Sequence, residues 1–159
     1  MKEDISHDLT LNHAHQPLSL YNTDFVLWAE KTAQALRERR LEELDWENLI
    51  EEIESLSRAE RQQLVSRLEV LIGHLLKWQY QPHRRSNSWE AAIREQRLKI
   101  ERLLKSSPSL TSFLDTAVEE GFVDGVNLAV RETNLPFSTF PKTCPYSVDE
   151  ILGDGFFPK

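Results

Sequence analysis

The sequence has little of what several large functional classes require. It is 159 residues long and contains one cysteine, five glycines and no apolar run near the roughly 20 residues of a transmembrane helix. One cysteine cannot form an internal disulfide, which is typical of proteins in a reducing compartment. The first residues carry acidic groups and no apolar segment, unlike a secretory signal peptide. We therefore expect a cytoplasmic protein that does not bind a membrane.

The motifs of common enzyme classes are also missing. The sequence contains no glycine-rich phosphate loop, no dinucleotide-binding fingerprint and no Gly-x-Ser-x-Gly nucleophile turn. Cys144 lies between Thr143 and Pro145, with no histidine nearby in the sequence, so we expect it to pack as a small apolar residue. These patterns predict no catalytic residue and no cofactor.

A metal-dependent enzyme is an alternative that the residue spacing does not support. Glu51, Glu54, His74 and His83 could converge if their helices were neighbours, but a di-iron site in a bundle needs Glu-x-x-His pairs. The sequence has neither such a pair nor a second cysteine. We therefore predict no metal site and expect His74 to be hydrogen-bonded at the edge of the core.

The sequence does have helical periodicity, from about residue 24 to residue 134. Apolar residues recur three and four positions apart, and no segment has the alternation of a strand. N-cap residues, one capping box and two prolines divide this region into five predicted helices. These helices begin near Asp24, after Asp45, at Ser57, near Ser86 or Ser88, and at Ser107.

These helices predict an all-α fold: a four- to five-helix bundle in a single domain of residues 23–159, behind a flexible arm of residues 1–22. The helix predicted from Ser57 to about residue 80 has the widest apolar stripe and should be central. Gly121 and Gly125 share one face of the last long helix and could admit a close neighbour.

The C-terminal segment should pack across the bundle. A capping box at Ser147 and Glu150 predicts a short helix over residues 148–152. Four phenylalanines in a segment with little other periodicity indicate packing against the core, although the last two could instead bind a partner; they are Phe137, Phe140, Phe156 and Phe157.

Charge is strongly segregated along the chain. The net charge is −7, which argues against a general nucleic-acid-binding protein. Residues 42–60, however, carry one basic and eight acidic side chains, whereas residues 77–105 carry eight basic and three acidic ones. The two blocks could form ion pairs within the fold, or the basic block could bind an anion.

The candidate binding site is a basic and aromatic cluster at a predicted helix–loop–helix turn within residues 77–97. A helix N-terminus favours anions, arginine matches phosphate or carboxylate, and an exposed tryptophan can stack on a base. The same residues could instead be structural, with arginines over tryptophans and Arg85 paired with Glu51 or Glu54. The cluster consists of Lys77, Trp78, His83, Arg84, Arg85, Trp89 and Arg94, and the same stretch also contains Tyr80 and Arg97.

Several motifs, in one order, carry a resemblance to a known family. They include Asp24-Phe25 with Trp28, the run Asn48-Leu49-Ile50-Glu51-Glu52-Ile53-Glu54, the run His74-Leu75-Leu76-Lys77-Trp78, and Ser107-Pro108-Ser109-Leu110. Over about residues 20–157 the chain resembles domain-of-unknown-function family 29, small proteins of bacteria and especially cyanobacteria. The resemblance implies an all-helical, soluble bacterial protein and brings no activity, cofactor or site residue.

Together these observations favour a non-enzymatic protein-interaction or regulatory module. We expect it to bind a protein partner, or a second copy of itself, through its charged helical faces or the phenylalanine-rich C-terminal segment. Anion or nucleic-acid binding at residues 77–97 is the first alternative, and metal-dependent catalysis is the second.

Overall fold

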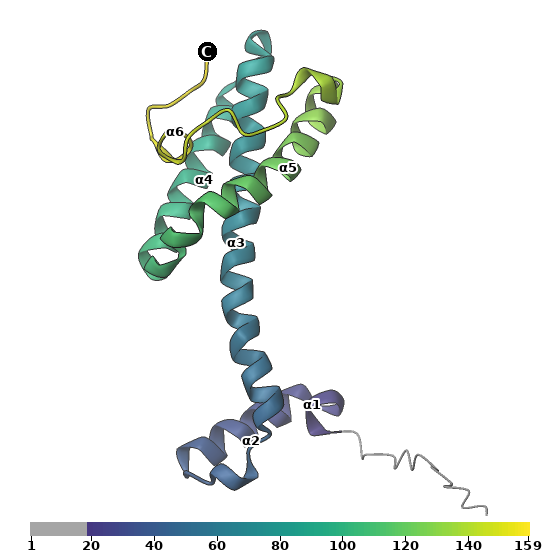
Figure 1. Ribbon diagram of the computed structural model, residues 1–159, viewed down its shortest axis with the longest axis vertical. Coiled ribbons are helices and arrows are strands. Elements are labelled where there is room, and N and C mark those ends of the chain that lie inside the picture. Colours follow the sequence, from purple (N-terminus) through teal and green to yellow (C-terminus); the bar gives the residue numbers. More distant parts are fainter. Residues whose placement is uncertain (1–18) are drawn as a thin grey trace, which may run out of the picture. The chain divides into compact units, whose positions relative to one another are not determined.

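The computed structural model describes residues 19–159, and over these residues the chain is helical with no β-strand (Figure 1). The predicted all-α fold is confirmed. The chain divides into two compact units, one ending at Ile53 and the other spanning Glu54–Lys159. We call residues 19–53 the N-terminal unit and residues 54–159 the C-terminal unit, and describe each by itself.

The N-terminal unit consists of three short elements and the start of a long helix. The elements are α1 (Leu20–Thr23), α2 (Phe25–Arg37), the 3-10 turn η1 (Leu41–Glu43) and the first turns of α3 (Trp46–Tyr80). Asp24 caps α2, because its carboxylate accepts a hydrogen bond of 3.0 Å from the Leu27 amide. Arg39 adopts a left-handed conformation (φ 58°) just beyond α2, which turns the chain toward η1.

The N-terminal unit has a very small core. Its buried hydrophobic residues are Trp28, Ala35 and Leu44. The ring of Tyr21 lies 4.9 Å from that of Trp28, and its hydroxyl donates a 2.5 Å hydrogen bond to Glu52 on α3. These contacts join α1 and α2 to the beginning of α3.

The predicted helix start at Ser57 is wrong, because α3 runs without a break from Trp46 to Tyr80. Ser57 and Glu60 have capping-box spacing, but both lie within the helix, where the backbone amides already have helical partners. The Glu60 carboxylate instead accepts a 3.1 Å hydrogen bond from the Ser107 hydroxyl. One 35-residue helix therefore replaces the two that were predicted.

The C-terminal unit packs α4 (Asn87–Ser106) and α5 (Leu114–Thr133) against the second half of α3 (Figure 1). Two 3-10 turns precede these helices, η2 (Pro82–Arg84) and η3 (Pro108–Phe113). The apolar side of α3 supplies the largest share of the core, as its wide stripe predicts: Leu64, Val65, Leu68, Leu71, Ile72, Leu75 and Leu76.

Glycines allow α5 to approach α3 closely, as predicted. A Cβ atom on Gly121 would lie 3.0 Å from the Glu69 amide nitrogen, and one on Gly125 would lie 3.1 Å from the Glu69 carbonyl oxygen. α5 continues through both glycines and ends at Asn134, which adopts a left-handed conformation (φ 58°). Small residues on this face therefore set the distance between two central helices.

The C-terminal segment packs on the core of this unit, as predicted. It contains η4 (Phe137–Thr139) and α6 (Val148–Leu152), and the Ser147–Glu150 capping box is formed. Phe140 is buried, and Phe156 and Phe157 pack against the core, while Phe137 is 60% exposed. The last two phenylalanines therefore serve the fold.

The predicted arm of residues 1–22 falls mostly outside the described residues, and its last three residues belong to α1. The single domain over residues 23–159 stays a prediction.

Candidate functional site

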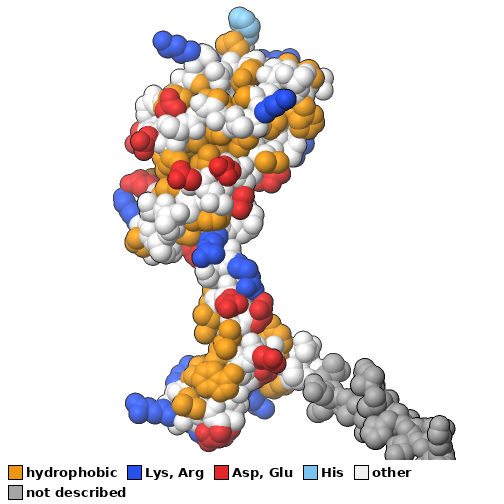
Figure 2. Space-filling view, viewed as in Figure 1, with side chains coloured by type: hydrophobic (Ala, Val, Ile, Leu, Met, Phe, Trp, Pro, Cys, Tyr) orange, Lys and Arg blue, Asp and Glu red, His pale blue; other side chains and the backbone are white. Residues whose placement is uncertain are grey.

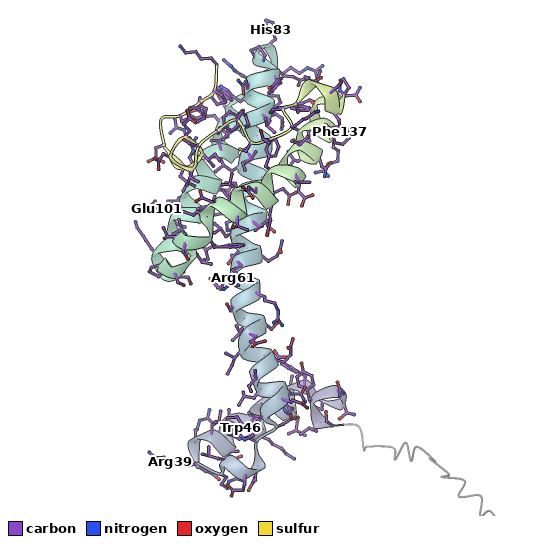
Figure 3. The ribbon with its side chains drawn as sticks, viewed as in Figure 1. Arg39, Trp46, Arg61, His83, Glu101 and Phe137 are labelled. Atoms are coloured by element: carbon purple, nitrogen blue, oxygen red, sulfur yellow. The ribbon has the colours of Figure 1, made fainter. Side chains whose placement is uncertain are left out.

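The predicted basic and aromatic cluster lies around the turn between α3 and α4. The structure brings its members close to the end of α5 and to the C-terminal segment, and His83 marks the turn (Figure 3). Each basic side chain of the cluster either contacts groups of the same unit or faces solvent.

Lys77 is a buried cation with an internal partner. Its side chain is 2% exposed, and its ammonium lies 2.5 Å from the Glu132 carboxylate of α5 and 4.3 Å from the centre of the Trp89 ring. Burial alone raises the pKa of Glu132, but the hydrogen bond and charge of Lys77 outweigh it and hold this pKa below its usual value. The pair therefore joins α3, α4 and α5.

Arg85 is tied to backbone carbonyls instead of to Glu51 or Glu54. Its guanidinium donates to the carbonyl oxygens of Trp78 (2.9 Å) and Pro158 (3.2 Å) and lies 5.1 Å from the centre of the Trp78 ring. This side chain therefore connects the end of α3 to the end of the chain.

Arg94 and Arg97 flank the ring of Phe157 from α4. Each guanidinium carbon is 5.5 Å from the centre of that ring, and Arg94 also pairs with Glu90 at 2.8 Å. Arg97 is 4% exposed and donates to the carbonyls of Ile151 (2.8 Å) and Phe156 (2.7 Å), with longer bonds of 3.4 Å to those of Glu150 and Asp154. Burial lowers the pKa of Arg97.

The structural role of Arg97 was not predicted, although the sequence holds a signal for it. Arg97 lies four residues after Ile93 and three before Ile100, which are both fully buried. An arginine at a core position of an amphipathic helix needs acceptors from another segment. The C-terminal segment supplies them as backbone carbonyls.

Arg84 and His83 of the cluster are exposed in η2. The amino end of α4 is capped from within, because the Ser86 hydroxyl accepts a 3.3 Å hydrogen bond from the Trp89 amide. Trp78, Arg85 and Arg94 therefore contact the C-terminal segment, whereas Lys77 and Trp89 contact each other within the bundle. Arg84, Arg85 and Arg94 are exposed, and binding of an anion here stays a prediction.

Two other side chains considered for chemistry are occupied by the fold. His74 is half-buried with Nδ1 2.9 Å from the Val70 carbonyl oxygen, and burial lowers its pKa. Burial raises the pKa of the Cys144 thiol, so it stays protonated near neutral pH. Within residues 19–159, no three His, Cys, Asp or Glu side chains are grouped as a metal ion would need.

The most unusual surface lies in the N-terminal unit. Eight of the twelve large hydrophobic residues exposed in the described chain belong to its 35 described residues (Figure 2). We call this set the N-terminal apolar surface: Phe25, Val26, Leu27, Leu36, Leu41, Trp46, Ile50 and Ile53.

The surface follows from where the apolar residues lie on each helix. Trp46, Ile50 and Ile53 are four and three residues apart, so they form one stripe along α3, and they are 51%, 53% and 60% exposed. Trp46 stands at the start of that helix (Figure 3). Trp28 and Ala35 take the buried positions of α2, and the half-exposed ring of Phe25 lies 5.5 Å from the buried ring of Trp28. The pattern marks an apolar stripe, but only packing decides whether it is covered.

None of the helices over residues 19–159 is both long and apolar enough to span a membrane. The family model described as "Domain of unknown function DUF29" matches residues 20–157 of the chain. The chain therefore belongs to this family. No curated protein and no solved structure matches it.

Proposed function

We propose that this protein is a non-enzymatic interaction module that binds another protein chain through the N-terminal apolar surface. The observation that carries the proposal is the concentration of exposed hydrophobic residues in 35 residues of the chain. Monomeric soluble proteins rarely expose large contiguous apolar areas, and those that do usually use them for binding. Full burial of an exposed side chain of this kind is worth about 1.5–3 kcal/mol, and because these side chains are 37–66% exposed, each offers a partner roughly half of that.

The proposal refines the expectation that charged faces or terminal phenylalanines bind the partner. Phe156 and Phe157 already pack against the core of the C-terminal unit, so they are not offered to a partner. Acidic side chains surround the exposed stripe of α3, including Glu47. An apolar centre with a charged rim is the usual composition of a protein–protein interface.

Binding of an anion or nucleic acid at residues 77–97 has less support. Lys77, Arg85 and Arg94 are engaged by a carboxylate, by carbonyls or by aromatic rings of the same unit. If this alternative holds, affinity for an oligonucleotide falls steeply with salt and is lost on Arg84→Ala. Binding that is absent, or independent of salt, contradicts it.

The experiment that tests the proposal compares two double variants of the full chain as bait in a lysate of the native cell. Ile50→Gln with Ile53→Gln removes apolar surface while retaining good helix formers, and Leu98→Gln with Val123→Gln is the matched control on exposed sites of the C-terminal unit. We expect the wild type and the control variant to retain a partner in a stoichiometric amount, which is either another protein or a second copy of this chain. The Ile50 and Ile53 variant should lose this partner.

Hydrogen exchange then locates the contact in the recovered complex. The proposal predicts slower exchange of the amides in α2 and in residues 46–53 when the partner is bound. Retention of the same partner by the Ile50 and Ile53 variant, or protection confined to the C-terminal unit, contradicts the proposal.

A further inference from the structure

We infer that the chain covering the N-terminal apolar surface is a second copy of this protein, joined through a two-fold pairing of the N-terminal units. This inference rests on the proposed function and names its partner. It follows from four features of the N-terminal unit: the size of its core, the apolar side chains it exposes, the arrangement of its apolar stripe and the distribution of its charges.

The first feature is the size of the core. Over residues 19–53 the N-terminal unit buries three hydrophobic side chains, and none of these residues is a cysteine. It exposes more large apolar side chains than it buries. A partner that is always available, such as a second copy, would supply the missing part of its core.

The second feature is the set of exposed apolar side chains. The eight side chains of the N-terminal apolar surface are between 37% and 66% exposed. Phe25, Val26 and Leu27 are consecutive in α2 and therefore point in different directions, so one interface covers only part of the set. Trp46, Ile50 and Ile53 lie on one side of α3, and they give a second copy a common apolar contact.

The third feature is the stripe itself. Trp46, Ile50 and Ile53 follow the four-and-three spacing of a coiled-coil seam. A helix stripe of this kind packs well against an identical stripe, and a two-fold interface requires a surface that is complementary to itself. Leu56, which is 69% exposed, extends the stripe three residues beyond Ile53, and Ser57 and Glu60 interrupt it further along α3. Pairing is therefore confined to the first turns of the helix.

The fourth feature is charge. The exposed Arg37 and Arg39 stand at the end of α2 with Glu38 between them, whereas the start of α3 is acidic and exposed at Glu47. Arg39 and Trp46 mark these two regions (Figure 3). One unit thus carries both positive and negative charges near the apolar surface. A two-fold axis can therefore place the basic end of α2 in one copy beside the acidic start of α3 in the other. A partner with one sign of charge would match only one of these regions.

The test is the mass of the full chain in solution, measured by sedimentation or light scattering over about a hundredfold range of concentration. The inference predicts twice the chain mass of 18.5 kDa at the upper end. Ile50→Gln with Ile53→Gln raises the dissociation constant at least about tenfold, whereas Leu98→Gln with Val123→Gln leaves it unchanged. Because the contact is mainly apolar, the dimer should persist in high salt.

A second variant shows whether loss of the dimer comes from the changed interface or from a misfolded chain. Ile53→Glu changes a side chain that is 60% exposed, so the monomer tolerates it, but a two-fold would bring two buried carboxylates into the interface. We expect this variant to be monomeric, with an unchanged helical circular dichroism spectrum. A dimer that survives Ile53→Glu overturns the inference, as does a wild type that is monomeric at every concentration.

Failure of this inference is distinguishable from failure of the proposed function. The wild type could be monomeric and still bind another protein, with that binding lost in the Ile50 and Ile53 variant. This result overturns the inference of a second copy and supports the proposed interaction module. A monomeric wild type that binds no chain through this surface overturns both. Association that weakens steeply with salt and needs a foreign basic chain also overturns the second copy.

Discussion

At the scale of single residues, the cations of the α3–α4 turn show how a pattern typical of a binding site can serve the fold. The expectation of an anion site rested on residue types that recognise phosphate, and those same types also bind carbonyls, carboxylates and aromatic faces. Arg97 forms four hydrogen bonds to backbone carbonyls of the C-terminal segment. Sequence alone does not show which acceptors lie within reach of an arginine.

Arg97 should therefore contribute strongly to stability. We expect Arg97→Met to lower the free energy of unfolding by about 2–4 kcal/mol, because it leaves several buried carbonyls without donors. Arg94→Met, which changes a side chain that is 57% exposed, should cost about 1 kcal/mol or less. Urea unfolding followed by circular dichroism measures both, and equal losses would contradict the assignment.

The Lys77–Glu132 pair should respond unequally to removal of its two partners. Glu132→Gln leaves an ammonium buried without an anion and should cost about 2–4 kcal/mol. Lys77→Met leaves a carboxylate that is 40% exposed and accessible to water, so its cost should be smaller. The same unfolding measurement decides this order, and a larger loss for Lys77→Met would show that the pair is not governed by burial of the lysine.

His74 should make stability depend on pH. Burial lowers the pKa of its imidazole below the ordinary 6.5, so protonation is harder in the folded chain than in the unfolded one. The stabilisation is complete above about pH 6.5 and is lost as pH falls through the folded-state pKa. We expect His74→Gln to flatten the decline in unfolding free energy between about pH 7 and pH 5 relative to the wild type; identical slopes would exclude this role.

At the scale of elements, the contact between α3 and α5 depends on glycine. Gly121→Ala adds a Cβ 3.0 Å from a backbone nitrogen of α3, and a backbone atom cannot move aside as a flexible side chain can. We expect a loss of about 1–3 kcal/mol even though alanine favours helix by about 1 kcal/mol. Gly155→Ala, which meets no atom within 4 Å, should be nearly neutral and is the control in thermal or urea unfolding.

The helices themselves were largely predictable, because periodicity, caps and prolines are local signals. The Ser147–Glu150 capping box, the close approach at Gly121 and the end of α5 near residue 134 all agree with the sequence-based predictions. The break at Ser57 was wrong because the same spacing is compatible with a helix interior when Glu60 has a partner elsewhere, here Ser107. A distant acceptor or donor decides such cases, and sequence order does not reveal it.

At the scale of the whole molecule, the main feature that the sequence does not reveal is which apolar residues are covered. The stripe of α3 has a similar period at Ile50 and at Leu71, yet the first is 53% exposed and the second is fully buried. Periodicity reports that a face is apolar and says nothing about what lies against it. An uncovered stripe is therefore information that comes from the structure, and it adds the N-terminal apolar surface as a candidate site, while binding at the basic turn stays a prediction.

Hydrogen exchange of the full chain, at high concentration and after dilution, measures directly whether a second copy covers the N-terminal apolar surface in solution. We predict that amides in α2 and in residues 46–53 exchange slowly at high concentration and faster on dilution, while those of α5 do not change. Exchange of residues 46–53 that is the same at every concentration would contradict the account.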